Sequence, residues 1–371
     1  MALKNKAFDI FLVLLPFLII MVSLSVIYSL VVNTSDSGLT LKQGISIVIG
    51  FVLMTLMSFT DYRFFRGTAW IFYVVTLLLL LYVDFFGFAA GGAMRWINLG
   101  FFQLQPSELA KIFLILALAS FFSQKVTKLA LKDIFVSFFI LLPSLALVLK
   151  EPDLGTALVL CFIYLIMLLV ARPSKKQIYL IFSVLLITVG IFLLSAYNIK
   201  PFNRLLHDYQ RHRVQIFIKP DLDPYGKGYH VRQAQIAIGA GGVYGKGLGK
   251  GSQSQLQFLP KPHTDFIFSG IAEAYGFFGA GVFLSLFIFL IMRIISIAEL
   301  ARDNFGMFIC FGLVAMLIFQ TIINVGMNLG LAPVTGIPLP FSSYGGSAMV
   351  AYLFLIGLAQ SIFIRHKKIT F

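Results

Sequence analysis

Ionisable side chains lie within or beside strongly apolar sequence in this chain of 371 residues, and six of them are candidate site residues. A charged group at membrane depth is costly unless it is paired or hydrated, so each of these residues is a candidate for binding or chemistry. No Ser-His-Asp arrangement, HExxH motif, CxxC pair or P-loop accompanies them, and any reaction must therefore depend on carboxylates and bases. The six candidates are Arg95, Glu108, Lys111, Lys150, Asp153 and Asp265.

Glu108 and Lys111 are three positions apart, a spacing that places them on one face of a helix. One interpretation is an ion pair within the helix that stabilises a contact in a helical bundle. The other is the wall of a polar cavity in which Lys111 binds an anionic ligand. Both can hold, because a buried ion pair is by itself weak evidence for stability.

Asp265 stands at the start of an apolar stretch, in the sequence Pro-His-Thr-Asp-Phe that begins at Pro262. We expect His263 or Thr264 near the helix N-cap, which would place Asp265 in the first helical turn. There the carboxylate is either a capping group or a general base at the mouth of a membrane cavity. Glu273, deeper in the same stretch, either pairs with another polar group or serves packing alone.

A charged turn separates two other apolar stretches and contains Lys150, Glu151 and Asp153. It is either an ordinary solvated turn, in which Pro152 and Gly155 set the bend, or part of a site. Topology alone favours the solvated turn, but these charges emerge on the same side of the membrane as the long hydrophilic segment of the chain, which counts against that interpretation.

Two further polar features have weaker functional signals. The glycine-rich segment 239–251 is a poor nucleotide fingerprint, although Lys246 and Lys250 are compatible with a flexible loop that accommodates anions. Asn324 and Asn328 are four positions apart and form a polar stripe, which favours a hydrogen-bonded contact between helices over a ligand site.

The composition requires that membrane-embedded elements position these residues. Apolar residues make up 59% of the chain, charged residues only 12%, and the mean hydropathy is +0.93. A soluble domain averages roughly half apolar and about a quarter charged. These values exclude a soluble enzyme, a disordered scaffold and a nucleic-acid-binding domain, despite the net charge of +14. Cys161 and Cys310 lie in apolar stretches and are expected to be buried hydrophobic residues.

The sequence predicts an all-α polytopic membrane protein with ten transmembrane helices. The break at Pro152 and Gly155 indicates two helices, rather than one, on either side of the charged turn. The ten predicted spans are Phe11–Val32, Gln43–Phe59, Gly67–Val83, Pro106–Phe122, Ile134–Leu149, Leu154–Ala171, Ile178–Ala196, Phe266–Met292, Gly306–Gly330 and Gly346–Ile364.

The distribution of basic residues predicts the orientation of these spans. With both termini in the cytoplasm, the cytoplasmic segments contain fifteen Lys and Arg, whereas the short outer loops contain only Lys42, Arg95 and Lys150. We expect a single membrane domain over residues 1–371, with one long extracytoplasmic loop, residues 197–264, between spans seven and eight. Its charged segment 203–219 is expected to lie amphipathically on the outer surface.

Four blocks of sequence together resemble the SEDS family (shape, elongation, division and sporulation) of bacterial cell-wall proteins, over nearly the whole chain. Within the family, the segments around GYHVRQAQIAIGAGGVYGKG and PVTGIPLP are more similar to the rod-shape branch than to the division branch. The blocks are RWINLGFFQLQPSELAK (95–111), EPDLGT (151–156), GKGLGKGSQSQLQFLPKPHTDFIF (245–268) and APVTGIPLPFSSYGGS (332–347).

The resemblance implies a peptidoglycan glycosyltransferase that polymerises lipid II outside the bacterial cytoplasmic membrane during cell elongation. It places the family's essential aspartate on Asp265 and its paired residues on Glu108 and Lys111, whereas Arg95 and Asp153 fall within other family blocks. The expected partners are a class B penicillin-binding protein and membrane proteins of the elongation complex. Many members carry an acidic residue where this chain has Lys261, which changes the local charge but leaves the aspartate intact.

The implied reaction is an inverting displacement of polyprenyl pyrophosphate from the donor glycan by a sugar hydroxyl of the acceptor lipid II. Asp265 is the expected general base, or the residue that orients that hydroxyl. The leaving pyrophosphate needs a cation, for which Arg95, Lys111, Lys150 and the loop lysines are candidates. A divalent cation bound by Asp265 is a rival source of that charge.

A lipid II flippase or other transporter, and a non-catalytic scaffold of the cell-wall machinery, are the alternative functions.

Overall fold

The structure, a computed structural model, describes residues 8–32, 38–90, 93–98, 100, 103–125, 129–196, 208–218, 223, 226–256, 258 and 262–366. Lys261 and residues 203–207 and 219 of the predicted amphipathic segment lie outside the described residues. The helices are α1 (Phe11–Val31), α2 (Gly38–Phe59), α3 (Phe64–Phe86), α4 (Pro106–Phe122), α5 (Leu131–Lys150), α6 (Leu154–Val170), α7 (Lys175–Ala196), α8 (Asp208–Ile218), α9 (Lys227–Gly241), α10 (Ser252–Gln255), α11 (Ile267–Leu300), α12 (Asn304–Asn328) and α13 (Gly346–Ile364). The strands are β1 (Phe88–Ala90), β2 (Ala93–Asn98) and β3 (Gln103–Leu104).

Every predicted span coincides with a helix, and the predicted all-α polytopic membrane fold is confirmed. Within the described part of the chain, eight helices are long and apolar enough to cross a membrane. The two others, α4 and α6, have 17 residues each. The predicted break between spans five and six is also confirmed, because α5 ends at Lys150 and α6 begins at Leu154. The count of ten spans itself stays a prediction.

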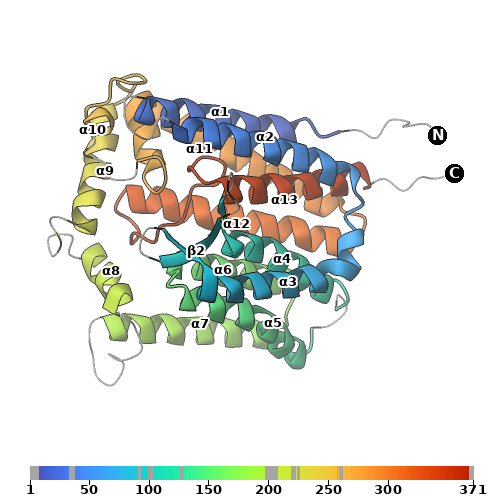
Figure 1. Cartoon of the computed structure of the whole chain (residues 1–371). Helices are drawn as coiled ribbons and strands as arrows, with labels where there is room; N and C mark the ends of the chain where they lie inside the picture. The colour runs from blue at the N-terminus through green and yellow to red at the C-terminus, as the bar shows by residue number, and fades with distance from the viewer. Residues whose placement is uncertain are drawn as a thin grey trace.

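Helices α4, α12 and α13 form the interior of the bundle. Most side chains of α4 and α13 are buried, including the polar residues Glu108, Lys111 and Gln360. Helix α7, by contrast, lies at the edge of the molecule in Figure 1 and exposes large apolar side chains along its length. Such an outward apolar surface suits a lipid environment, in which the polar groups of the protein must face inward.

A small antiparallel sheet, which the sequence analysis did not predict, connects α3 to α4. The central strand β2 pairs with β1, where Phe88 lies opposite Trp96, and with β3, where Ile97 lies opposite Leu104. Strands of two to six residues are too short to produce a clear alternation of apolar and polar residues in a sequence. The sheet matters for the site because β2 carries Arg95.

The segment between α7 and α11 contains the helices α8, α9 and α10, which lie at one end of the bundle in Figure 1. The beginning of α1 and the end of α13 lie at the opposite end. Helix α8 packs on the rest of the protein through the buried side chains of Val214 and Ile216, whereas Phe217 and Ile218 are exposed. This end of the bundle, defined by α8–α10 and the sheet, is called the loop end below.

Helix α11 is broken at Gly276, which has a left-handed φ of 70°. With 34 residues the helix would be about 51 Å long if straight, well beyond the hydrocarbon thickness of about 30 Å. The glycine-rich segment after α9 satisfies backbone groups on both sides of the break. Its hydrogen bonds join Lys246 N to Glu273 O, Gly247 N to Ala274 O, Phe277 N to Gly242 O, and Phe278 N to Val243 O.

The glycines of this segment therefore serve close packing, in place of the flexible anion-accommodating loop considered from the sequence. A Cβ added at Gly245 would lie 2.3 Å from the carbonyl oxygen of Ala274, and Gly245 itself has a φ of +82°. The loop lysine Lys246 is also occupied, because its Nζ lies 2.8 Å from the Ser252 hydroxyl and 4.0 Å from the Glu273 carboxylate. Glu273 thus pairs with polar groups of the long loop.

We expect Gly245→Ala to lower the free energy of unfolding by about 3 kcal/mol. The new methyl group would both force an alanine into the left-handed region and overlap the backbone of α11, and each effect costs about 1–3 kcal/mol. Gly249→Ala is the matched control, because Gly249 has a similar φ of +73° but open space around a Cβ. Thermal unfolding in detergent, followed by circular dichroism, measures both variants. Equal stability of the two variants would contradict the packing argument.

Candidate functional site

Asp265 precedes α11 and lies outside its first turn, so the prediction that it belongs to that turn is wrong. The N-cap of α11 is Phe266, no side chain caps the helix, and the first turn contains no acidic residue. The physical reason lies in α12. In a longer α11 the Ser269 N–H would donate to the Asp265 carbonyl, whereas here it donates to the side chain of Asn328. Asp265 therefore occupies an irregular turn and is partly buried.

The turn that carries Asp265 is held along its length by backbone contacts. The Tyr344 N–H donates to the His263 carbonyl at 2.8 Å, and the Ser343 hydroxyl donates to the Thr264 carbonyl at 2.7 Å. Asn324 of α12 donates to the Asp265 carbonyl at 3.1 Å. Residues 332–345, which connect α12 to α13 and are called the α12–α13 connection below, thus line one side of the turn.

Asp153 lies next to the same connection from another direction. Its carboxylate caps α6 by accepting the Thr156 N–H at 3.0 Å and the Thr156 hydroxyl at 2.9 Å. A Cβ added at Gly155 would lie 3.0 Å from the Thr335 carbonyl, and one added at Gly336 would lie 3.8 Å from Oδ2 of Asp265. The α12–α13 connection therefore lies against Asp265 and against Gly155, the second residue of the helix that Asp153 caps, and it joins two segments more than a hundred positions apart.

Arg95 on β2 fastens the charged turn between α5 and α6. Its Nε donates to the Glu151 carbonyl at 2.9 Å and its Nη2 to the Pro152 carbonyl at 2.7 Å. Nη1 lies 3.8 Å from the Asp153 carboxylate. The structure thus joins Arg95 to Asp153, two of the predicted site residues, and the turn is not an ordinary solvated loop.

The same turn contains a buried carboxyl that the sequence analysis noticed but did not assign. Glu151 is 3% exposed, and neither of its carboxyl oxygens has a hydrogen-bond partner among the described residues. Burial, with the nearby charges of Asp153 and Asp84, raises the pKa of Glu151 to about 8, and Arg95 opposes the shift. At neutral pH this side chain therefore holds a proton.

Lys150 emerges from the same turn and is more exposed than Arg95 or Lys111. Its side chain is 63% exposed, and its Nζ lies 3.0 Å from the Asp84 carboxylate at the end of α3. Asp84 was not a candidate from the sequence, because nothing in its neighbourhood distinguishes it from a residue at a helix end. Lys150 is positioned to meet an anion that approaches from outside the bundle.

Glu108 and Lys111 form the buried ion pair that their spacing predicts. Oε2 of Glu108 lies 2.7 Å from Nζ of Lys111, and the two side chains are 4% and 1% exposed. The ammonium group lies 5.8 Å from the centre of the Tyr352 ring on α13. The pair is thus attached to the core of the bundle, and an anion can reach Lys111 only if this packing opens.

Arg213 of α8 is a cation of the site that sequence reasoning missed. Its Nη1 donates to the Thr335 carbonyl at 3.1 Å, so it contacts the connection that also lies against Asp265 and Gly155. The charged character of segment 203–219 was visible in the sequence, but no spacing rule connects that segment to a peptide more than a hundred residues later. Only the packing of α8 places Arg213 here.

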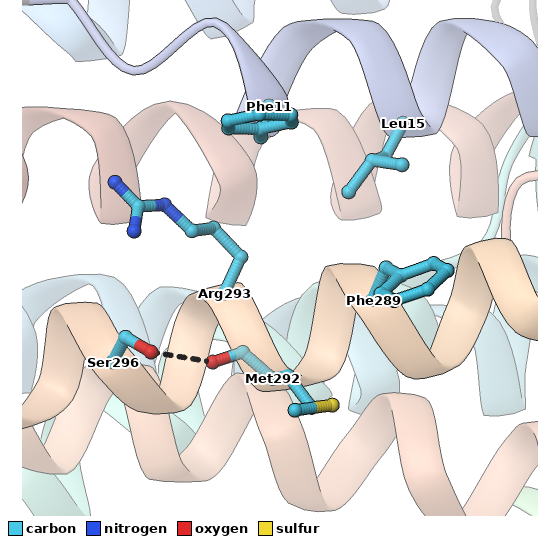
Figure 2. A pocket seen from close by; sticks show the side chains of 6 residues that line it. All are labelled: Phe11, Leu15, Phe289, Met292, Arg293 and Ser296. Atoms are coloured by element: carbon cyan, nitrogen blue, oxygen red, sulfur yellow. Dashed lines mark hydrogen bonds between the residues drawn. The ribbon is translucent and has the colours of Figure 1, made fainter.

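The described residues form no metal-binding cluster at the site, and one groove of the protein lies elsewhere in the bundle. Among the residues that the structure describes, no group of three or more His, Cys, Asp or Glu side chains is arranged to hold a metal ion. The described donors around Asp265 therefore do not by themselves form a site for a divalent cation. A groove of about 420 Å³ lies between α1 and α11, as Figure 2 shows, but toward the opposite end of α11 from Asp265. Its lining residues are Phe11, Leu15, Phe289, Met292, Arg293 and Ser296.

Comparison with known proteins agrees with the motifs. The family of cell cycle proteins that includes FtsW, RodA and SpoVE matches residues 6–368. The peptidoglycan glycosyltransferase MrdB of Escherichia coli K12 is 38% identical over 356 residues, which cover 95% of this chain and 94% of that protein. The probable peptidoglycan glycosyltransferase FtsW of Geobacter metallireducens is 36% identical over 330 residues, or 88% of this chain and 85% of that protein.

A solved structure extends the likeness to three dimensions. A chain from a peptidoglycan synthase complex, described as coordinating polymerization and crosslinking, matches with a TM-score of 0.81 and 32% identity. The match covers 97% of this chain and 98% of that chain. Sequence and fold thus agree from end to end, and the chain belongs to the FtsW/RodA/SpoVE family of cell cycle proteins, the SEDS family that its motifs predict.

Proposed function

We propose that the protein is a peptidoglycan glycosyltransferase that polymerises lipid II into glycan strands at the outer face of the bacterial cytoplasmic membrane during cell elongation. In this proposal residues 1–371 form one membrane domain with ten spans and cytoplasmic termini, and residues 197–264 form the outer loop. The arrangement in Figure 1 supports it, because α8–α10 lie at the end of the bundle opposite the beginning of α1 and the end of α13. The positive-inside bias supports the same orientation.

The observation that carries the proposal is the placement of Asp265 in an irregular, partly buried turn that α12 and the α12–α13 connection both hold. Such a carboxylate can meet the acceptor hydroxyl in one fixed geometry. As the hydroxyl oxygen forms a bond to the anomeric carbon of the donor, its proton passes to Asp265 and the bond from that carbon to pyrophosphate breaks. A carboxylate is a modest base for an alcohol, so positioning carries much of the rate enhancement.

The departing pyrophosphate requires positive charge at the loop end, and we assign this role first to Lys150 and Arg95. Lys150 is exposed, and Arg95 orders the turn that carries it. Asp153 positions that turn through its cap on α6. Glu108 and Lys111 support the interior wall of the site, and no step requires a divalent cation. The polyprenyl tail of the substrate stays in the lipid that the apolar outer surface of the bundle faces.

The proposed partner is a class B penicillin-binding protein, a transpeptidase that cross-links the new strands within the elongation complex. The related chain from a synthase complex that coordinates polymerization and crosslinking supports this choice. A flippase for lipid II, or a scaffold without activity, is the competing function, and both differ from a polymerase in a measurable way.

Asp265→Asn is expected to lower the rate of lipid II polymerisation by at least about 100-fold, because the loss of a general base typically costs 10²–10⁴-fold. Purified protein with its transpeptidase partner is incubated with lipid II, with and without a chelator, and the products are separated on a gel. Asp61→Asn, an exposed aspartate at the other end of the bundle, is the control and should leave activity unchanged. Normal polymer from Asp265→Asn, or transport of lipid II by protein that forms no polymer, would contradict the proposal.

Lys111→Met is expected to lower the free energy of unfolding by about 3–5 kcal/mol, because it leaves the buried Glu108 carboxylate uncompensated. The double variant with Glu108→Gln should regain most of that loss. Thermal unfolding in detergent measures both, and Lys125→Met, which breaks a partly exposed pair with Asp133, should cost less than about 1 kcal/mol. Polymerisation by the stable double variant then separates a packing role for the pair from a role in substrate binding.

Glu151→Gln is expected to remove a pH dependence of stability. The ordinary carboxyl pKa of 4.5 applies to the unfolded chain, whereas burial raises the pKa of Glu151 to about 8 in the folded protein. Between these values the folded state binds more protons, so wild-type stability falls as pH rises, by up to about 1.4 kcal/mol per pH unit. The variant should therefore gain most over wild type near pH 8, measured by thermal unfolding at pH 5.5 and 8. Glu299→Gln, at an exposed position, is the control, and an equal pH slope in all three proteins would contradict the assignment.

A further inference from the structure

Two buried asparagines on α12 converge on the backbone carbonyl of Asp265. Nδ2 of Asn324 and Nδ2 of Asn328 both donate to it, each at 3.1 Å, and both side chains are 0% exposed. The two residues are one helical turn apart, so their amide groups lie on the same face of α12. A carbonyl oxygen has two lone pairs, and here both are used by side chains of another helix.

Asn328 also replaces the hydrogen bond that would extend α11 toward its N-terminus. In a longer helix the Ser269 N–H would donate to the Asp265 carbonyl four residues earlier. The amide of Asn328 lies between these groups instead: its Oδ1 accepts the Ser269 N–H at 3.1 Å, and its Nδ2 donates to the carbonyl. The Ser269 hydroxyl donates to the same Oδ1 at 2.5 Å. Asn328 therefore takes the place of the Asp265 carbonyl as a partner of the Ser269 N–H, which also donates to the Phe266 carbonyl at 3.1 Å.

Asn324 joins the Asp265 turn to the α12–α13 connection. Its Nδ2 donates to the Ile337 carbonyl at 2.8 Å as well as to the Asp265 carbonyl. Gly336, next to Ile337, faces the carboxylate of Asp265. One amide group thus fixes both the peptide from which the carboxylate projects and the backbone that lies against it.

We propose that Asn324 and Asn328, the asparagine clamp, are positioning residues that set the location of the Asp265 carboxylate for reaction. The inference rests on the proposed role of Asp265. A contact that only packs helices together would join α11 and α12 within their regular turns. Here both amides donate hydrogen bonds to the one irregular peptide that carries the acid. Displacing a reacting group by about 1 Å can cost on the order of 100-fold in rate.

The test compares the polymerisation kinetics of Asn324→Leu and Asn328→Leu, which keep the approximate side-chain size but remove the amide. We expect kcat to fall by about 10- to 100-fold while KM for lipid II stays unchanged, because the clamp touches the acid and not the substrate. Ser120→Ala is the matched control. It removes a buried side-chain hydrogen bond to the Arg66 carbonyl, 2.9 Å long and remote from Asp265, and should keep wild-type kcat.

Folding is measured separately by thermal unfolding and by co-purification with the transpeptidase partner. If a leucine variant fails to fold, Asn324→Ser and Asn328→Ser replace it, because serine stays polar but is too short to reach the carbonyl. Wild-type kcat in folded clamp variants, beside an inactive Asp265→Asn, would overturn the clamp alone. A raised KM with unchanged kcat would also overturn it. Full activity of Asp265→Asn would instead overturn the proposed role of the aspartate.

Discussion

Backbone groups that leave a regular helix need hydrogen-bond partners from the protein wherever lipid or packed side chains exclude water, and this constraint organises the whole molecule. At the break in α11, the glycine-rich segment supplies those partners by close approach of backbone to backbone. At the Asp265 turn, the asparagine clamp and the α12–α13 connection supply them. At the turn between α5 and α6, Arg95 does so. In each irregular segment, carbonyls that have no partner within a regular helix therefore accept hydrogen bonds from another part of the protein, which holds the segment in place.

Buried charged side chains also need partners, and leaving one unpaired costs more free energy than leaving a backbone group unpaired. The Glu108–Lys111 pair neutralises itself within one helical turn, at the cost of removing both groups from water. Glu151 has no such partner within hydrogen-bonding distance in the part of the chain that the structure describes, and it keeps its proton instead. Because the Glu151 side chain is neutral, it does not offset the charge of the Arg95 guanidinium, which interacts with Asp153 and with the carbonyls of the turn. The turn therefore keeps more positive charge at the place where the proposed anionic leaving group would be stabilised.

These arrangements explain how a bundle of apolar helices can present a precise polar site. Asp265 and Arg213 come from different elements, and the α12–α13 connection contacts both of them and also lies against Gly155, in the first turn of the helix that Asp153 caps. A transferase that uses a carboxylate of ordinary basicity depends on geometry more than on proton affinity. Rigid support for the peptide of Asp265 is therefore the feature that the proposed chemistry most requires, and the clamp supplies it from the centre of the bundle.

The sequence alone determined the membrane fold, the helical stretches and the pairing of Glu108 with Lys111, because hydrophobic length and helical periodicity are local properties of a chain. It also selected Asp265 as the candidate acid through motifs. Only the tertiary structure decided that Asp265 lies outside its helix, that Asn324 and Asn328 hold its carbonyl, and that Arg213 reaches the same place. Those outcomes depend on hydrogen bonds between segments that are far apart in the sequence, and a local pattern of residues does not predict such contacts.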